Sequence, residues 1–255
     1  SHDCMAEICG AALLANKHIF IEKPAGISSA QLEKLCDLAS KSQSIVRVGY
    51  NHRYHRSVQQ AKKLIDGGAV GRLICIRCNY GHGGRVGYDR EWRAYKHYGG
   101  GELVDQGSHV IDLMRFLTQQ DWELKYGAAK TLFWDMEVDD NAFFFMETRS
   151  GISGIGHVSC TEWKNSFSME IYGLNGKISL SGLGGSYGLE KITYYKMTEE
   201  MGPPVTTSWE FPMDDDSWTS ELSMFKRDVE AGFGSPPDLH DAKAVMSLVE
   251  RIRGY

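Results

Sequence analysis

The run His18-Ile19-Phe20-Ile21-Glu22-Lys23-Pro24 decides the fold of the first part of the chain. Its short apolar, β-rich segment lies between two helical patterns, which is typical of a buried parallel strand. A helix pattern that ends near Ala39 and a second strand over 45–50 complete a β-α-β unit. Ligands of open α/β sheets bind beyond the carboxyl ends of the strands. Lys23 is therefore expected beside a cofactor or substrate, although a lysine at a strand end is also compatible with a plain surface position.

Beyond Gly71 the pattern changes to consecutive strands. Turn signals at Ser150-Gly151 and Asn175-Gly176 predict hairpins and hence an antiparallel sheet. We expect a helix from about Asp105 and two C-terminal helices on the flank of this sheet. The fold class is α/β plus α+β. The predicted strands cover 73–80, 123–134, 141–149, 151–161, 166–172, 177–181 and 191–196, and the predicted C-terminal helices cover 217–231 and 239–252.

The segment Gly99-Gly100-Gly101-Glu102-Leu103-Val104-Asp105-Gln106-Gly107-Ser108-His109 indicates chemistry. The three glycines leave room for a ligand, and the apolar residues that follow recur at helical intervals. Positions i and i+4 share one helix face, so we expect Asp105 and His109 to be neighbours, with Asp112 on the same stripe. A carboxylate beside an imidazole favours the protonated ring and suits acid/base catalysis. The alternative is a capping aspartate and a histidine that only packs.

The composition limits the classes of molecule that the protein is expected to bind. The chain has 255 residues, 42% of them hydrophobic, and a formal net charge of -5 without a basic run. These values argue against nucleic acid or an anionic membrane as partner and favour a small molecule. No apolar stretch approaches 18 residues, and no charged-then-apolar leader is visible.

The six cysteines are scattered and lack the density of a disulfide scaffold, which favours a reducing, cytoplasmic setting. Cys75 and Cys78 mimic a metal motif, but residues three apart on a strand face opposite sides. We therefore predict no metal site. His52 and His55 have no matched ligand pair and are interpreted as loop residues near a domain junction.

Several of these motifs together resemble the glucose-fructose oxidoreductase / inositol dehydrogenase (GFO/IDH/MocA) family of nicotinamide-dependent enzymes. The resemblance extends over nearly the whole chain. It implies a Rossmann nucleotide-binding domain, here residues 1–54, and a C-terminal α+β domain for substrate binding and oligomerisation, here residues 55–255. The matching pieces are Glu22-Lys23-Pro24, 48–54, Trp92-Arg93, the Asp105-x-x-x-His109 segment, 139–142 and 172–177.

The resemblance implies NAD or NADP as cofactor and hydride transfer to or from a secondary alcohol of a sugar or nucleotide-sugar. Lys23, Asp105 and His109 would be catalytic and would also bind the substrate. Glu22, Lys23, Pro24, Trp92 and Arg93 would contact the cofactor. The alternative for Trp92-Arg93 is a buried indole beside a surface ion pair.

The loop that leaves the first predicted strand of the second domain is expected to shape specificity in such an enzyme. Arg85 and Tyr88, in and after Gly81-His82-Gly83-Gly84, would bind substrate, and Arg85 suits a phosphate or carboxylate. Together with 162–165 and 183–187, this loop is similar to the branch of the family that acts in nucleotide-sugar and polysaccharide biosynthesis.

One family feature has no counterpart in the sequence. Family members open with a Gly-x-Gly-x-x-Gly turn that holds the cofactor pyrophosphate, and no such fingerprint occurs here. We therefore expect a nucleotide-binding domain without its N-terminal part, very weak cofactor binding and an inactive chain.

The sequence leaves two other functions open. Some relatives cleave glycosides with a retained NAD and much the same residues. A non-catalytic binding or assembly module is the third interpretation. The resemblance also implies a homo-oligomer through an open sheet face that bears Phe143, Phe145, Tyr172 and Tyr194; alternatively, these aromatic side chains fill the intramolecular core.

Overall fold

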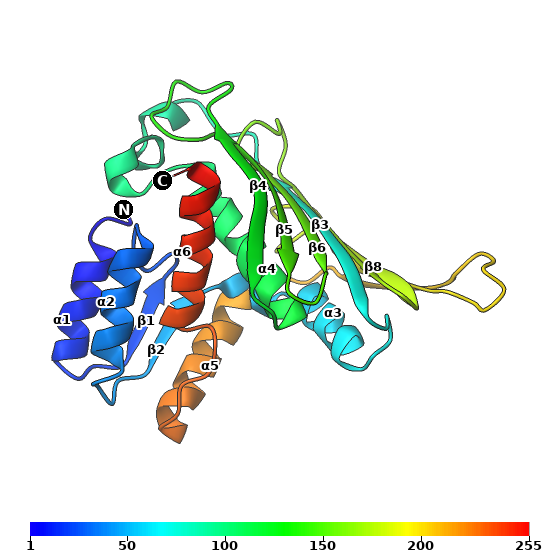
Figure 1. Ribbon diagram of the computed structural model, residues 1–255, viewed down its shortest axis with the longest axis horizontal. Helices are drawn as coiled ribbons and strands as arrows, with labels where there is room; N and C mark the ends of the chain where they lie inside the picture. The colour runs from blue at the N-terminus through cyan, green and yellow to red at the C-terminus, as the bar shows by residue number, and fades with distance from the viewer. Residues whose placement is uncertain (255) are drawn as a thin grey trace.

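The computed structural model describes residues 1–254. Its smaller, N-terminal part is a two-stranded parallel sheet, β1 and β2, flanked by helices α1 and α2 (Figure 1). The expected β-α-β unit is thereby confirmed. Its elements are α1 (Met5–Leu14), β1 (Ile19–Glu22), α2 (Ser29–Ala39) and β2 (Val46–Gly49), followed by a short 3-10 helix, η1 (Asn51–Tyr54).

The second half is built on an eight-stranded sheet with the order β10-β9-β8-β7-β3-β6-β5-β4. Its strands are β3 (Leu73–Gly81), β4 (Trp122–Lys130), β5 (Asn141–Thr148), β6 (Ser153–Ser159), β7 (Ser166–Gly173), β8 (Gly176–Ser181), β9 (Glu190–Lys196) and β10 (Val205–Phe211). The helices are α3 (Arg56–Asp66), α4 (Ser108–Thr118), α5 (Ser217–Ala231) and α6 (Leu239–Arg253).

The sheet is mixed, not antiparallel as the hairpin signals predicted. β3 pairs with β7 antiparallel but with β6 in parallel, Cys75 opposite Ser153. Because β3 is inserted between two later strands, turn signals around those strands could not reveal its neighbours. The predicted hairpins β5–β6 and β7–β8 are present.

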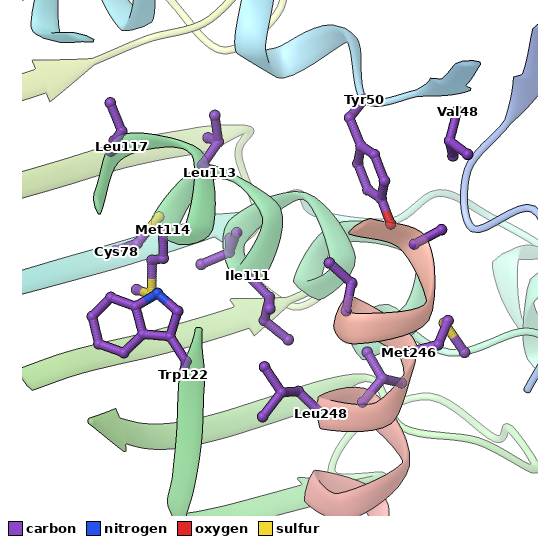
Figure 2. Packing of buried hydrophobic residues seen from close by; sticks show 14 of the residues in the cluster. Val48, Tyr50, Cys78, Ile111, Leu113, Met114, Leu117, Trp122, Met246 and Leu248 are labelled. Atoms are coloured by element: carbon purple, nitrogen blue, oxygen red, sulfur yellow. The ribbon is translucent and has the colours of Figure 1, made fainter. Parts of the chain in front are cut away.

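Helices α3, α4 and α6 cover one face of the sheet, and the other face is bare (Figure 1). The core lies between α4, α6 and the sheet. Figure 2 shows Ile111 on α4 and Leu248 on α6 pointing toward each other, with Met114 near Trp122 on the sheet side. All four side chains are buried.

The two halves are tied together by the C-terminal helices. α6 packs on α2 and on β4, and the Phe20 ring on β1 lies 5.7 Å from the Phe225 ring on α5. The buried Arg47 on β2 donates to Asp228 on α5 at 2.5 Å. These contacts fix the β1 and β2 strand ends relative to α4, which is what the site requires. The domain boundary at residues 54 and 55 stays a prediction.

Candidate active site

A pocket of about 470 Å³ lies between the two halves, at the carboxyl ends of β1 and β2. Lys23, Asp105 and His109 all line it, although Lys23 is far from the other two in sequence. The expectation that the three share one site is therefore met by the geometry. Further lining residues are His2, Glu22, Asn51, His52, His55, Tyr80, Trp92, Arg93, Gln106, Leu183, Gly184, Ser186, Tyr187, Asp215 and Trp218.

Asp105 is held by two cations. Lys23 Nζ donates to Asp105 Oδ1 at 2.7 Å, and Arg93 Nε donates to Asp105 Oδ2 at 2.9 Å. Burial opposes ionisation of this carboxyl, but Lys23 and Arg93 outweigh it and hold the pKa of Asp105 well below its usual range. Asp105 is thus a carboxylate at neutral pH that orients the lysine.

The expected contact between Asp105 and His109 is absent from the described hydrogen bonds, and the reason lies in the helix. Residues Leu103–Gly107 form a π-helical turn ahead of α4, so Asp105 lies inside the helical segment and is not its cap. A π turn contains more residues than an α turn, which moves positions i and i+4 off a common line. The Asp105 carboxylate consequently faces Lys23 and Arg93.

His109 lies in a different setting from the one the sequence predicted. Burial, the neighbouring His52 and the Lys23 charge hold the pKa of His109 well below its usual value, so the ring is neutral. Its Nδ1 is buried and has no hydrogen-bond partner among the described residues. A neutral imidazole with a free nitrogen is able to accept a proton.

His52 also lines the pocket, a role beyond its predicted place near a domain junction. Its ring stacks on that of His109 with centroids 3.7 Å apart and an interplanar angle of 14°. The signal was available: Asn51 and His52 follow β2 directly, as Lys23 follows β1, and the ends of adjacent parallel strands meet at one edge. His55 is also present, 3.4 Å from Glu190 Oε2 through its Nδ1.

Four of the five residues expected near the cofactor, Glu22, Lys23, Trp92 and Arg93, line the same pocket, and Pro24 is not among its lining residues. The Lys23-Pro24 peptide bond is cis. The Arg93 guanidinium lies 4.6 Å from the Trp92 ring centroid, and His2 packs edge-on against that ring. Glu22 lines the pocket, and burial raises the pKa of its carboxyl. Trp92-Arg93 thus joins the site through Asp105 and is not merely a surface ion pair.

Arg85 and Tyr88, expected to bind substrate, are not brought to the pocket lining. The Arg85 side chain is 64% exposed and makes two hydrogen bonds of 2.8 Å to Glu91. Tyr88 is buried, with its hydroxyl 3.5 Å from His82 Nε2. The loop 183–187 does contribute Leu183, Gly184, Ser186 and Tyr187 to the lining.

The glycines before the helix serve the chain itself and not a ligand. A Cβ at Gly100 would collide with the Arg93 carbonyl, and a Cβ at Gly101 would collide with the Arg253 guanidinium. Gly101 also has φ of 104°. Gly100 therefore requires glycine so that the Arg93 backbone can approach it, and Gly101 so that Arg253 and Asp139 can.

Within residues 1–254 no group of three or more His, Cys, Asp or Glu side chains is arranged to hold a metal ion. In the same range no helix has the length and apolar character needed to cross a membrane. Cys75 is partly exposed, and Cys78 is buried on the helix-covered side of β3.

Comparisons with known proteins agree with this architecture. Residues 2–50 match the oxidoreductase family model with an NAD-binding Rossmann fold, and residues 58–179 match the GFO/IDH/MocA C-terminal domain. A myo-inositol 2-dehydrogenase of Thermotoga maritima is 23% identical over 96% of this chain and 71% of its own.

Solved structures show the same fold. A levoglucosan dehydrogenase in complex with NADH and levoglucosan superimposes with a TM-score of 0.86 at 21% identity, covering 98% of this chain and 75% of that one. A 3-ketoreductase from Actinomadura kijaniata, in complex with NADP and TDP-benzene, gives a TM-score of 0.82 at 18% identity, covering 99% and 75%.

These matches do not support the expectation of a truncated nucleotide-binding domain or of an inactive chain. They do show that both parts of the chain match models of the same family. The chain belongs to the GFO/IDH/MocA family of NAD(P)-dependent oxidoreductases.

Proposed function

We propose that this protein transfers a hydride between a nicotinamide cofactor and a secondary alcohol carbon of a sugar or nucleotide-sugar, with Lys23, Asp105 and His109 around the reacting carbon. One observation carries the proposal. A lysine held by a carboxylate at 2.7 Å and a neutral histidine line the same pocket between the two halves.

His109 would handle the proton. Oxidation of an alcohol releases a proton from the hydroxyl as the hydride leaves its carbon, and a neutral imidazole accepts that proton. In the reverse direction, the imidazolium returns it to the forming alcohol. The lowered pKa of His109 keeps the ring neutral at neutral pH, which is the state that a proton acceptor in alcohol oxidation requires.

Lys23 would stabilise the oxygen. Its ammonium group lies at the pocket wall, oriented by Asp105 and by the Asp105 carbonyl oxygen, to which it also donates. A fixed positive charge aimed at a developing alkoxide lowers the energy of the transition state. Arg93 keeps Asp105 in place from the other side.

The residues present fit a nicotinamide cofactor. Lys23, Pro24 and Glu22 follow the carboxyl end of a parallel strand, where such cofactors bind, and the Trp92 ring with the Arg93 charge forms a second wall. When bound, the nicotinamide would accept or donate the hydride. Titration of the protein with NADH and with NADPH, followed by Trp92 fluorescence, would show which of the two it prefers.

A spectrophotometric assay tests the proposed function. The protein is incubated with NAD or NADP and with myo-inositol, levoglucosan or a nucleotide-sugar, and the absorbance of reduced nicotinamide is followed. Accumulation of reduced cofactor in step with oxidised sugar is the expected result. Glycoside cleavage without net reduction would point to the hydrolase with a retained NAD, and cofactor binding with neither reaction to a non-catalytic module.

The bare sheet face supports a homo-oligomer. Tyr126, Phe143 and Ile155 are 63%, 39% and 46% exposed on neighbouring strands β4, β5 and β6, and a contiguous apolar surface of this kind is typical of a subunit interface. Tyr194 does not belong to this face, because its hydroxyl donates to the Ala69 carbonyl on the helix-covered side. Sedimentation of the wild type and of Ile155→Lys tests the proposal: a mass that is unchanged by the lysine would exclude this face.

We also propose a cytoplasmic location. All six cysteines are free, as expected of a chain kept in a reducing compartment. Fractionation of the producing cells tests this directly.

A further inference from the structure

The imidazole of His52 is held on both edges. Asn51 Nδ2 donates to Ser217 Oγ at 3.0 Å, so the Asn51 carbonyl oxygen is the atom that accepts from His52 Nδ1 at 3.0 Å. Nδ1 therefore carries the hydrogen. In the neutral ring Nε2 then carries no hydrogen, and it accepts a hydrogen bond from the Tyr80 hydroxyl at 2.9 Å.

These bonds define a rigid platform beneath His109. The two imidazole rings are nearly parallel, and the Tyr50 ring meets His109 edge-on at 6.1 Å and 86°. His52 is 8% exposed and His109 6%, so neither ring has free space in which to rotate. His109 itself has no hydrogen bond at Nδ1 that would fix its plane. Packing against His52 and the Tyr50 ring therefore fixes the His109 ring, and His52 is the neighbour that lies parallel to it.

We propose that His52 is a positioning residue of this site: a neutral imidazole, locked in the Nδ1–H tautomer by Asn51 and Tyr80, whose face sets the plane of the His109 ring. The role rests on the proposed function, because it matters only if His109 handles the proton.

The surrounding charges explain why the platform has to stay neutral. Lys23 from the end of β1 and His55 from the turn before α3 face both rings, and Asp105 from the π turn is the one acid that acts on His52. A second proton on His52 would displace the hydrogen bond from Tyr80 and add a cation beside Lys23. A neutral ring instead offers its π face to His109 when His109 becomes an imidazolium during the reaction.

Nitrogen NMR of protein labelled at histidine with ¹⁵N tests the lock without any substrate. We expect His52 to show the neutral Nδ1–H tautomer at every pH from 5 to 8, and Tyr80→Phe to move its Nε2 resonance because the accepted hydrogen bond is lost. A His52 that titrates within this range, or that carries its hydrogen on Nε2, would overturn the proposal.

Kinetics of two variants test the positioning. His52→Ala removes the platform, and we expect turnover to fall between about ten- and a hundredfold with KM little changed and with a displaced pH profile. His52→Phe restores a flat ring in the same place without its hydrogen bonds, and turnover should return toward the wild-type value.

The outcomes separate the two proposals. Equal losses in His52→Ala and His52→Phe would mean that stacking is not what matters, and normal turnover in His52→Ala alongside an impaired His109→Asn would remove His52 while leaving the proposed function intact. Normal turnover in His109→Asn would refute the proposed function itself.

Discussion

Two acids on one continuous helical segment, Asp105 and Asp112, have opposite surroundings. Asp105 lies on the pocket wall between Lys23 and Arg93. Asp112, seven residues later, is fully buried and accepts two hydrogen bonds from Arg53, at 2.8 and 2.6 Å. Both are paired with cations, and both were on the helix stripe that the sequence predicts.

The two carboxylates differ in whether a ligand could reach them. The Asp105 cluster borders a pocket and includes, in His109, a nitrogen that nothing in the described residues satisfies. The second cluster is closed at Asp112, which is fully buried, although Arg53 and Asp241, 3.1 Å apart, border a separate cavity of about 510 Å³. A buried ion pair is thus weak support for a site by itself. Changes in the open cluster should affect turnover, and changes in the closed cluster should affect stability.

The largest effect is expected in the open cluster, for His109→Asn. The amide cannot take up the proton, so turnover should fall by about two to four powers of ten while the protein stays folded. Steady-state rates combined with circular dichroism check this. A folded variant with near-normal turnover would take His109 out of the mechanism.

Lys23→Met should lower turnover by a comparable amount, again about two powers of ten or more, because the charge that faces the developing alkoxide is lost. KM for the sugar should rise as well. If this variant changes only the melting temperature, Lys23 is a structural residue and the open cluster reduces to His109.

The closed cluster should respond in the other way. Asp112→Asn leaves the Arg53 charge with Asp241 alone, and we expect the free energy of unfolding to fall by about 3 kcal/mol. Urea unfolding measures this. kcat of the remaining folded protein should match the wild type, and a pH profile altered as in His109→Asn would erase the distinction between the clusters.

Glu221 on α5 sharpens the comparison, because it is fully buried and both of its carboxylate oxygens lack a partner among residues 1–254. Burial and the nearby Glu22 raise the pKa of Glu221 to about 8. Folding raises the pKa of this carboxyl, so the folded state is less stable at higher pH. The loss begins near the pKa of the unfolded state, 4.5, and continues until the pH reaches about 8. The wild type should therefore lose more stability between pH 5 and pH 8 than Glu221→Gln, by on the order of 2 kcal/mol. Parallel pH dependences would show that Glu221 is ionised or hydrated.

The smallest effect is expected outside both clusters, at Arg85. Its two hydrogen bonds to Glu91 are solvent-exposed, so Arg85→Ala should change the free energy of unfolding by less than about 1 kcal/mol. KM should stay constant, since Arg85 does not line the pocket. A clear rise in KM for an anionic sugar would return Arg85 to the substrate site, as the sequence predicts.

Sequence patterns predicted the helices and most strands because these elements bury a periodic apolar face. α5 and α6 fall within one residue of their predicted ends. β10 was missed: it is an edge strand whose side chains are mostly exposed, so no apolar alternation marks it. The parallel pairing of β3 with β6 was missed because it joins strands that no turn connects.

The sequence predicted which residues lie in the pocket better than it predicted the contacts between them. Lys23, Asp105 and His109 share the pocket, but the partner of Asp105 is Lys23, 82 residues away, and not His109. No local pattern encodes a contact of that range. His52 was overlooked because a histidine after a strand has many structural uses, although its position after β2, next to the end of β1, was a signal, and its stacking on His109 places it in the pocket.

The π-helical turn Leu103–Gly107 has a consequence for engineering. A π turn amounts to one extra residue in an α-helix, and each residue of an α-helix rotates the chain by about 100°. Deleting one residue between Asp105 and His109 would therefore let the segment become a regular α-helix and change the direction of the Asp105 side chain, so we expect its contacts with Lys23 and Arg93 to be lost. The π turn thus sets the direction in which the Asp105 side chain points relative to that of His109.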